Sequence, residues 1–427
     1  MDNQNASPPG PGFVEALRVW AKIGLTSFGG PAGQIALMHR ALVEERGWLS
    51  EREYLTALNF CMLLPGPEAM QLATYAGWKL HGVKGGLAAG LLFVLPGAVI
   101  VLSLTMLYAA LGKLPLAEAL FYGIKAAVLA IVIEALVRVA RRALKTGADW
   151  VIAALAFAAL FFFAMPFPVV IVAAGLYGFW RASSAAEPHH ASVPGWRELA
   201  GTVALWGAIW LVPLAALALL LGPHHVLTEV GVFFSKLALV TFGGAYAVLA
   251  YMAQAAVETQ GWLSATEMMD GLALAETTPG PLILVTQFVG YFAGLREMGS
   301  MWGGLAAAAV TLWMTFAPCF LWIFAGAPYV EALGKRPRLS GALAAITAAV
   351  VGVILNLSLW FGLHVLFGQV ERLPGWFRPW VPDWTNLDGS ALALSGLAAL
   401  ALLRFRLGIV PVLALSAVLG AAAKLLA

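Results

Sequence analysis

The sequence predicts an all-α polytopic membrane protein built from two inverted-topology repeats with broken helices. Three observations support this fold class: a strongly apolar composition, apolar stretches that recur along the chain, and motifs that recur at one fixed spacing. Of the 427 residues, 61% are hydrophobic and only 11% are charged, whereas charged residues make up about 25% of ordinary globular domains. A chain of this composition is expected in a lipid bilayer.

Apolar stretches long enough to cross a membrane recur through the chain. A transmembrane helix needs about 20 mostly apolar residues. The segment 149–181 reads as two shorter spans broken by "MPFP", and a terminal hairpin turns at "RFR", residues 404–406. Together the segments predict roughly 10 to 13 crossings. The clearest long stretches are 85–111, 117–137, 199–221, 302–325 and 339–366.

The remaining composition argues against several classes of function. Cys61 and Cys319 are isolated within apolar segments, so neither a metal nor a cofactor is expected. The net charge of +3 comes from residues scattered through short loops, which argues against nucleic acid as a partner. The first dozen residues, "MDNQNASPPGPG", lack the features of a cleaved signal peptide. We therefore expect the first helix to be part of the mature protein. We also expect the N-terminus to lie in the cytoplasm.

An internal repeat accounts for the recurring motifs. "LTSFGGPAG" at 25–33 matches "LVTFGGAYA" at 239–247, and "RGWLSEREY" at 46–54 matches "QGWLSATEM" at 260–268. "LPGPEA" at 64 matches "TPGPLI" at 278, and all three pairs are 214 positions apart. A collinear series without gaps indicates a duplication. We divide the chain into a first repeat, 1–181, a polar linker, 182–198, and a second repeat, 199–427.

The charge of equivalent loops predicts that the two repeats are inverted. In the first repeat, Lys113 lies between the long helices and a basic cluster follows them, from Arg138 to Lys145. In the second repeat the basic cluster "GKRPR", 334–338, lies between the helices instead. Because short loops rich in Lys and Arg stay in the cytoplasm, equivalent loops face opposite sides. Inverted repeats with broken helices are typical of secondary transporters.

The helix breaks are the candidate substrate site. Paired glycines can mark a close helix crossing or an unwound segment that exposes backbone groups to a substrate, and their recurrence beside a second break favours the latter. Pro67 and Pro281 suit the first position of a new helix, whose free amides would favour an anion. The candidate substrate-binding residues in these breaks are Phe28, Gly29, Gly30, Pro65, Gly66, Pro67, Phe242, Gly243, Gly244, Pro279, Gly280 and Pro281.

Four charged residues complete the candidate site. Lys22 and Lys236 lie in apolar segments, where a lysine is a functional candidate by default, although a side chain that snorkels to the interface is the alternative. Glu68 would compete with a substrate anion for the positive end of its helix, which suggests proton coupling, and Glu276 could share that role. The structural alternative is that the Glu68 carboxylate only complements the helix dipole.

Other motifs have structural explanations. Gly47 suits a helix C-terminus, and Ser50 with Glu53 forms the pattern of a capping box, which Ser264 with Glu267 repeats. We therefore assign these carboxylates to helix capping.

The motif windows resemble the chromate ion transporter family in its long, two-domain form. The resemblance rests on "SFGGPAGQIALMHRALVEERGWL" and "LLPGPEAMQLATYAGW" in the first repeat, and on "TFGG", "GWLS" and "TTPGPLILVTQFVG" in the second. It implies a bacterial inner-membrane exporter of chromate that also recognises sulfate, with the Phe-Gly-Gly and Pro-Gly-Pro motifs in the substrate region. Glu68 is replaced by Leu282 in the second repeat, so the two repeats are not equivalent.

Two alternatives to chromate export remain open on sequence alone. One is uptake or exchange of sulfate or another inorganic anion. The other, from a different class, is an intramembrane enzyme that acts on a lipid or a phosphate ester, for which we find no strong nucleophile, base or metal motif. No GxxxxGK[ST] pattern occurs in the sequence, so an ion gradient is expected to drive transport. A homo-oligomer is compatible with the sequence.

Overall fold

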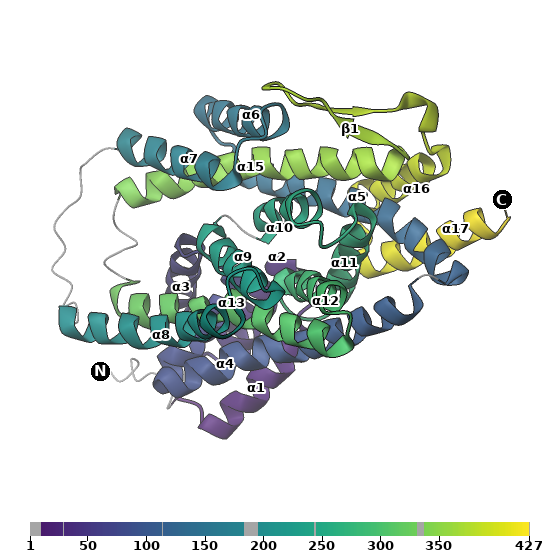
Figure 1. Ribbon diagram of the computed structural model, residues 1–427. Helices are drawn as coiled ribbons and strands as arrows, with labels where there is room; N and C mark the ends of the chain where they lie inside the picture. The colour runs from purple at the N-terminus through teal and green to yellow at the C-terminus, as the bar shows by residue number, and fades with distance from the viewer. Residues whose placement is uncertain are drawn as a thin grey trace.

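The computed structural model describes residues 10–28, 30–112, 114–182, 195–242, 245–330 and 337–426. The chain is all-α, as predicted, with one small two-stranded sheet (Figure 1). Among the described residues, five helices are long and apolar enough to cross a membrane, and four shorter apolar helices accompany them. The predicted division of 149–181 into two helices is confirmed, and so is the terminal hairpin.

The elements of the first repeat follow one another without strands. They are α1 (Phe13–Thr26), α2 (Gly30–His39) with a π-helical continuation (Arg40–Glu44), α3 (Glu51–Leu63), α4 (Glu68–Leu111), α5 (Pro115–Ala143), α6 (Gly147–Phe161) and α7 (Phe167–Arg181).

The second repeat begins with a helix that has no counterpart in the first. That helix is α8 (Trp196–Leu221). The motif-bearing part follows it: α9 (Val226–Val240), α10 (Ala245–Gln254) with a π-helical continuation (Ala255–Thr259), α11 (Ala265–Thr277), a 3-10 turn (Leu282–Leu284), α12 (Val285–Met298) and α13 (Met301–Gly326) with a 3-10 turn (Ala327–Tyr329).

The last part of the chain contains the β-hairpin and the terminal helices. Its elements are α15 (Pro337–Leu366), β1 (Val370–Arg372), β2 (Trp380–Pro382), a 3-10 turn (Trp384–Asn386), α16 (Gly389–Ala399) with a π-helical continuation (Leu400–Arg404) and α17 (Ile409–Leu426).

Helix boundaries match the repeated motifs. α3 and α11 each begin with a complete capping box, formed by Ser50 with Glu53 and by Ser264 with Glu267, which confirms the structural interpretation of these residues. Gly47 has φ +60° just after the π-helical turn, as expected for a helix C-terminus. In both repeats, therefore, the same local signals end one helix and begin the next.

α4 folds back on itself and corresponds to the α12 and α13 pair. Its backbone leaves helical geometry at His81 and Gly82, and a Cβ atom added to Gly85 would lie 2.2 Å from the Gly77 carbonyl oxygen. In the second repeat, a Cβ atom on Gly294 would lie 2.3 Å from the Gly303 carbonyl oxygen. Glycine is required at these positions because the two arms of each hairpin are in backbone contact.

The helices form two groups with the broken segments between them (Figure 1). In one group α15 packs against α5, α6 and α7, and α5 also packs against α16 and α17. In the other, α1 packs on α4, and α13 packs on α4, α8, α9 and α12. α11 contacts both groups. The helix breaks therefore lie in the interior, between the two groups.

The β-hairpin is the element that the sequence did not predict. β1 and β2 pair in antiparallel register, with Glu371 opposite Val381. Phe162, in the turn after α6, stacks on Phe377 at a centroid distance of 5.4 Å. The hairpin thus covers the end of α6 through aromatic contacts between residues that are far apart in the sequence.

Candidate functional site

The two kinds of helix break meet at the centre of the molecule, each pairing with the break of the other repeat. The Gly66 N–H donates to the Thr241 carbonyl oxygen at 2.8 Å, and the Gly280 N–H donates to the Ser27 carbonyl oxygen at 3.0 Å. Gly66 and Gly280 are 214 positions apart, as are Ser27 and Thr241. These reciprocal bonds are what a two-fold relation between the repeats produces. We call this region the crossing.

The crossing depends on two glycines in unusual conformations. Gly66 has φ +124° and Gly280 has φ +100°, values that residues with a Cβ atom rarely adopt. A Cβ atom on Gly66 would also lie 2.6 Å from Nε2 of Gln71 and 3.0 Å from Sγ of Cys319. A Cβ atom on Gly280 would lie 3.0 Å from a methyl group of Leu284 and 3.2 Å from the Cα atom of Gly97 on α4. Both middle residues of the Pro-Gly-Pro motifs therefore need to be glycine.

Two buried glutamines hold the crossing, and the sequence analysis missed both. Gln34 on α2 donates from Nε2 to the carbonyl oxygens of Gly280, at 2.5 Å, and Ser27, at 3.4 Å. Gln71 on α4 donates from Nε2 to the Pro65 carbonyl oxygen at 2.7 Å. The sequence carried a signal for both: each is a single side-chain amide shortly after a Phe-Gly-Gly or a Pro-Gly-Pro motif, in an otherwise apolar segment. A polar side chain in such a segment usually has a defined hydrogen-bond partner.

The helix that follows each Pro-Gly-Pro motif starts one or more residues later than predicted. Pro67 is the N-cap of α4 rather than its first helical residue. Pro281 precedes a 3-10 turn, so α12 itself begins only at Val285. The expected first position is therefore wrong for both prolines, because their ψ angles remain in the extended region. The amides that follow still form the start of a helical segment.

Glu68 and Glu276 lie near the crossing in different surroundings. Glu68 is half-buried and its carboxylate accepts a hydrogen bond from its own backbone N–H. Glu276 is 7% exposed, and the Tyr246 hydroxyl donates to its Oε1 at 2.8 Å. Leu282 stands where Glu68 would have its counterpart, so each repeat contributes one carboxylate from a different position.

α5 carries basic side chains whose charge acts on both carboxylates, which the sequence analysis did not anticipate. Arg138 forms an ion pair with Glu134 one turn earlier, with Nε 3.2 Å from Oε1. Arg138 interacts electrostatically with Glu276, and Arg142 does so with Glu68. The signal was the spacing of four between Glu134, Arg138 and Arg142, which places them along one helix face. In the sequence we used these arginines only to orient the loops.

Some of the predicted residues lie outside this centre or outside the described residues. Lys22 on α1 and Lys236 on α9 both lie on exposed faces, and within the described ranges neither forms an ion pair. Phe28 is 46% exposed and Phe242 is partly buried. The positions outside the described residues are Gly29, Gly243 and Gly244.

Paired helix breaks within an all-helical membrane fold are an architecture of membrane transporters. Sequence comparison then gives the family: the chromate transporter family profile matches residues 14–179 and 228–421, and the chain belongs to this family. The chromate transport protein of Pseudomonas aeruginosa is 33% identical over 362 residues, covering 82% of this chain and 81% of the relative.

Other relatives agree with this assignment. The chromate transport protein of Cupriavidus metallidurans is 31% identical over 344 residues, 80% of either chain. A probable chromate transport protein of Synechococcus elongatus is 30% identical over 381 residues, 86% of this chain and 91% of the relative. No solved structure matches the chain.

Proposed function

We propose that the protein exports chromate across the bacterial inner membrane as a secondary active transporter, that it also recognises sulfate, and that an ion gradient drives it. The observation that carries this proposal is the crossing, where two helix starts from opposite repeats meet in the interior. Family membership supports chromate as the substrate. The energy source is inferred from the lack of a GxxxxGK[ST] pattern in the sequence, and export is the direction that the family resemblance implies.

The crossing has the chemistry that a tetrahedral dianion requires. Free backbone N–H groups at a helix start, together with the helix dipole, favour negative charge. The candidate donors are the amides of 68–70 and 282–284. One amide on each side is already used: the Leu284 N–H donates to the Pro281 carbonyl oxygen at 2.9 Å, and the Glu68 N–H donates to its own carboxylate. Arg138 and Arg142 provide positive charge near the crossing, and Lys22 and Lys236, on exposed faces outside the crossing, attract the anion from a greater distance.

Glu68 gives the site a means of coupling to protons. Its carboxylate already occupies the start of α4 through its own backbone N–H. A dianion at the same place would be repelled by an ionised carboxylate, so anion binding and the protonation state of Glu68 are linked. Glu276, bonded to Tyr246, is the corresponding carboxylate on the second repeat. Both would change protonation during the transport cycle.

Chromate accumulation in whole cells tests the proposal. Cells that carry the protein should accumulate less chromate than cells without it, and a protonophore should abolish the difference. Higher accumulation in the presence of the protein would instead support uptake, and sulfate uptake measured in parallel would identify the exchange alternative. Phosphate release by the purified protein would support the enzyme alternative.

A further inference from the structure

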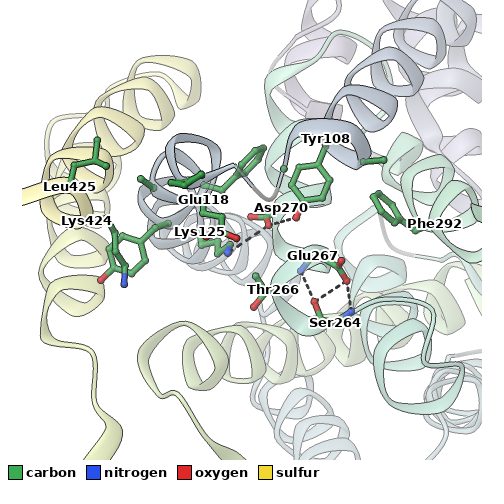
Figure 2. Close-up of a pocket in the computed structure, with 16 residues that line it drawn as sticks. Tyr108, Glu118, Lys125, Ser264, Thr266, Glu267, Asp270, Phe292, Lys424 and Leu425 are labelled. Carbon is green, nitrogen blue, oxygen red and sulfur yellow. Dashed lines mark hydrogen bonds and ion pairs between the residues drawn. The ribbon is translucent and has the colours of Figure 1, made fainter. Parts of the chain in front are cut away.

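A second polar site lies away from the crossing, in a pocket between the two repeats (Figure 2). The pocket has a volume of about 610 Å³ and is lined by the end of α4, the first turns of α5 and α11, part of α12 and the end of α17. Its titratable lining residues are Tyr108, Glu118, Tyr122, Lys125, Glu267 and Lys424 together with Asp270.

Asp270 is the buried centre of this pocket. Its side chain is 3% exposed, and its Oδ2 accepts a hydrogen bond from the Tyr108 hydroxyl at 2.7 Å. The Lys125 Nζ lies 3.6 Å from the same oxygen, and Figure 2 shows both side chains directed toward Asp270. Oδ1 of Asp270 is buried and has no partner among the described residues. One carboxylate oxygen is thus left able to accept a proton.

The other charged groups around the pocket already have partners or lie at its mouth. Glu267 bonds to Ser264 and Arg296. Lys424 lies over the ring of Tyr122 at 4.7 Å. Tyr122 donates to Asp388, and Glu118 is exposed. In the described part of the chain, Asp270 and Lys125 are therefore the ion pair with a buried carboxylate that faces this pocket, its lysine side chain being 19% exposed.

A purely structural role does not explain the pair well. Burying an ion pair costs desolvation energy that the mutual attraction barely returns, and ionisable residues inside membrane proteins mark functional sites by default. The position 214 residues before Asp270 is Thr56, so the duplicated scaffold folds in the other repeat without this carboxylate. The carboxylate of Asp270 is therefore not shared by the two repeats.

The pair also joins the two repeats. Asp270 belongs to α11 of the second repeat, whereas Tyr108 and Lys125 belong to α4 and α5 of the first. Asp270 and Glu276 lie on the same helix six residues apart, about 9 Å along its axis. A change in the charge of Asp270 therefore alters a contact between the two repeats. Asp270 itself lies on the helix that carries Glu276 to the crossing.

We propose that Asp270 binds a further proton in the transport cycle, in addition to those of Glu68 and Glu276, with Lys125 as its built-in counter-ion and the pocket as the route for water to reach it. The step is a proton transfer from a hydronium ion, which arrives through the water of the pocket and is left as water, to Asp270, which becomes a neutral carboxylic acid while Lys125 keeps its charge. The ion pair across the repeats is then lost and Lys125 is free to attract another anion. This inference rests on the proposed transport function.

Infrared difference spectroscopy of the purified full-length protein tests proton binding without any substrate. Acidification should produce a carboxylic acid band in the wild type that disappears in Asp270→Asn. Glu118→Gln, which removes an exposed carboxylate at the mouth of the same pocket, is the matched control and should keep the band. If the Asp270→Asn spectrum retains every band of the wild type, the proposal is wrong.

Lys125→Met covers the case in which Asp270→Asn does not fold. This variant keeps the carboxylate but removes the opposite charge that favours its ionised form, so the same band should persist at more alkaline pH than in the wild type. A band at unchanged pH would remove Lys125 as the counter-ion and overturn the proposal.

Transport in proteoliposomes separates this inference from the proposed function. With an imposed proton gradient, Asp270→Asn should lose gradient-driven chromate movement, while chromate binding and Glu118→Gln transport persist. Gradient-driven movement that survives in a folded Asp270→Asn protein would contradict the coupling role. If the wild type itself neither binds nor moves chromate, the proposed function fails, and the infrared result alone then decides whether Asp270 is a proton site.

Discussion

The two repeats share a backbone but not their chemistry. At the crossing, the Gly66 bond to Thr241 and the Gly280 bond to Ser27 are equivalent. The polar side chains are not equivalent. Gln34, Glu68 and Gln71 of the first repeat correspond to Val248, Leu282 and Val285 of the second, each 214 positions later. The duplication has preserved the helix breaks, while each repeat carries different functional groups.

The second repeat contributes its own polar groups at other positions. Tyr246, Asp270 and Glu276 correspond to Ala32, Thr56 and Met62 of the first repeat. A symmetric scaffold can supply two access states around one site, whereas unequal side chains can give the two states different affinities for the anion and the proton. The comparison predicts that substitutions at the shared glycines of the helix breaks reduce both stability and transport. Substitutions of side chains that only one repeat carries should affect either anion binding or proton coupling.

The largest effect is expected for Gly66→Ala and Gly280→Ala. Each introduces a Cβ atom at a φ that such residues rarely adopt, a strain of about 1–3 kcal/mol, and at Gly66 the Cβ atom also meets Gln71 at 2.6 Å. Both variants should lose transport and unfold at lower temperature. Gly47→Ala is the control, because φ there is +60° and nothing lies within 4 Å of the added atom. Equal behaviour of all three variants would contradict the importance of the crossing.

Lys22→Met and Lys236→Met should weaken oxyanion binding by about tenfold each, the equivalent of ~1.4 kcal/mol, without changing stability. Both side chains are exposed, so their removal leaves no cavity. Chromate binding by isothermal titration calorimetry measures the effect, with thermal unfolding as the control. Unchanged affinity in either variant would remove that lysine from the site.

Glu68→Gln should uncouple transport from the proton gradient while chromate binding is retained. The amide keeps the shape of the side chain but cannot change its charge, so anion binding should no longer vary with protonation at this position. Chromate transport measured against pH in proteoliposomes provides the test. A pH dependence identical to that of the wild type would show that Glu68 carries no proton. Leu282→Glu offers the reverse experiment, since it makes the second repeat resemble the first.

The smallest effect is expected at the capping boxes, where the repeats are equal. Ser50→Ala and Ser264→Ala should each cost about 1 kcal/mol and leave transport unchanged. A hydrogen bond from the Ser50 backbone N–H lowers the pKa of Glu53, so this carboxylate stabilises the protein above its ordinary pKa. That stabilisation should be lost as the pH falls through the lowered value. Thermal unfolding against pH in the wild type and in Glu53→Gln measures it, and identical profiles would contradict the assignment.

The fold was predictable because its signals are local and occur twice. Proline and glycine fix the breaks, serine with glutamate fixes the helix starts, and the offset of 214 links the repeats. The contacts between α5 and the carboxylates were not predictable, because Lys125 and Asp270 are joined only by packing across the repeats. Periodicity shows that Arg138 and Arg142 share a helix face but not what that face meets. The β-hairpin was missed because its strands of three residues carry almost no pattern.

A structure of the protein with bound chromate, in which the anomalous scattering of chromium locates the anion, would test the site most directly. The oxyanion should lie at the crossing, within hydrogen-bonding distance of the backbone amides at 68–70 or 282–284. Chromate bound only in the pocket beside Lys125, with an empty crossing, would contradict the assignment of the helix breaks as the substrate site.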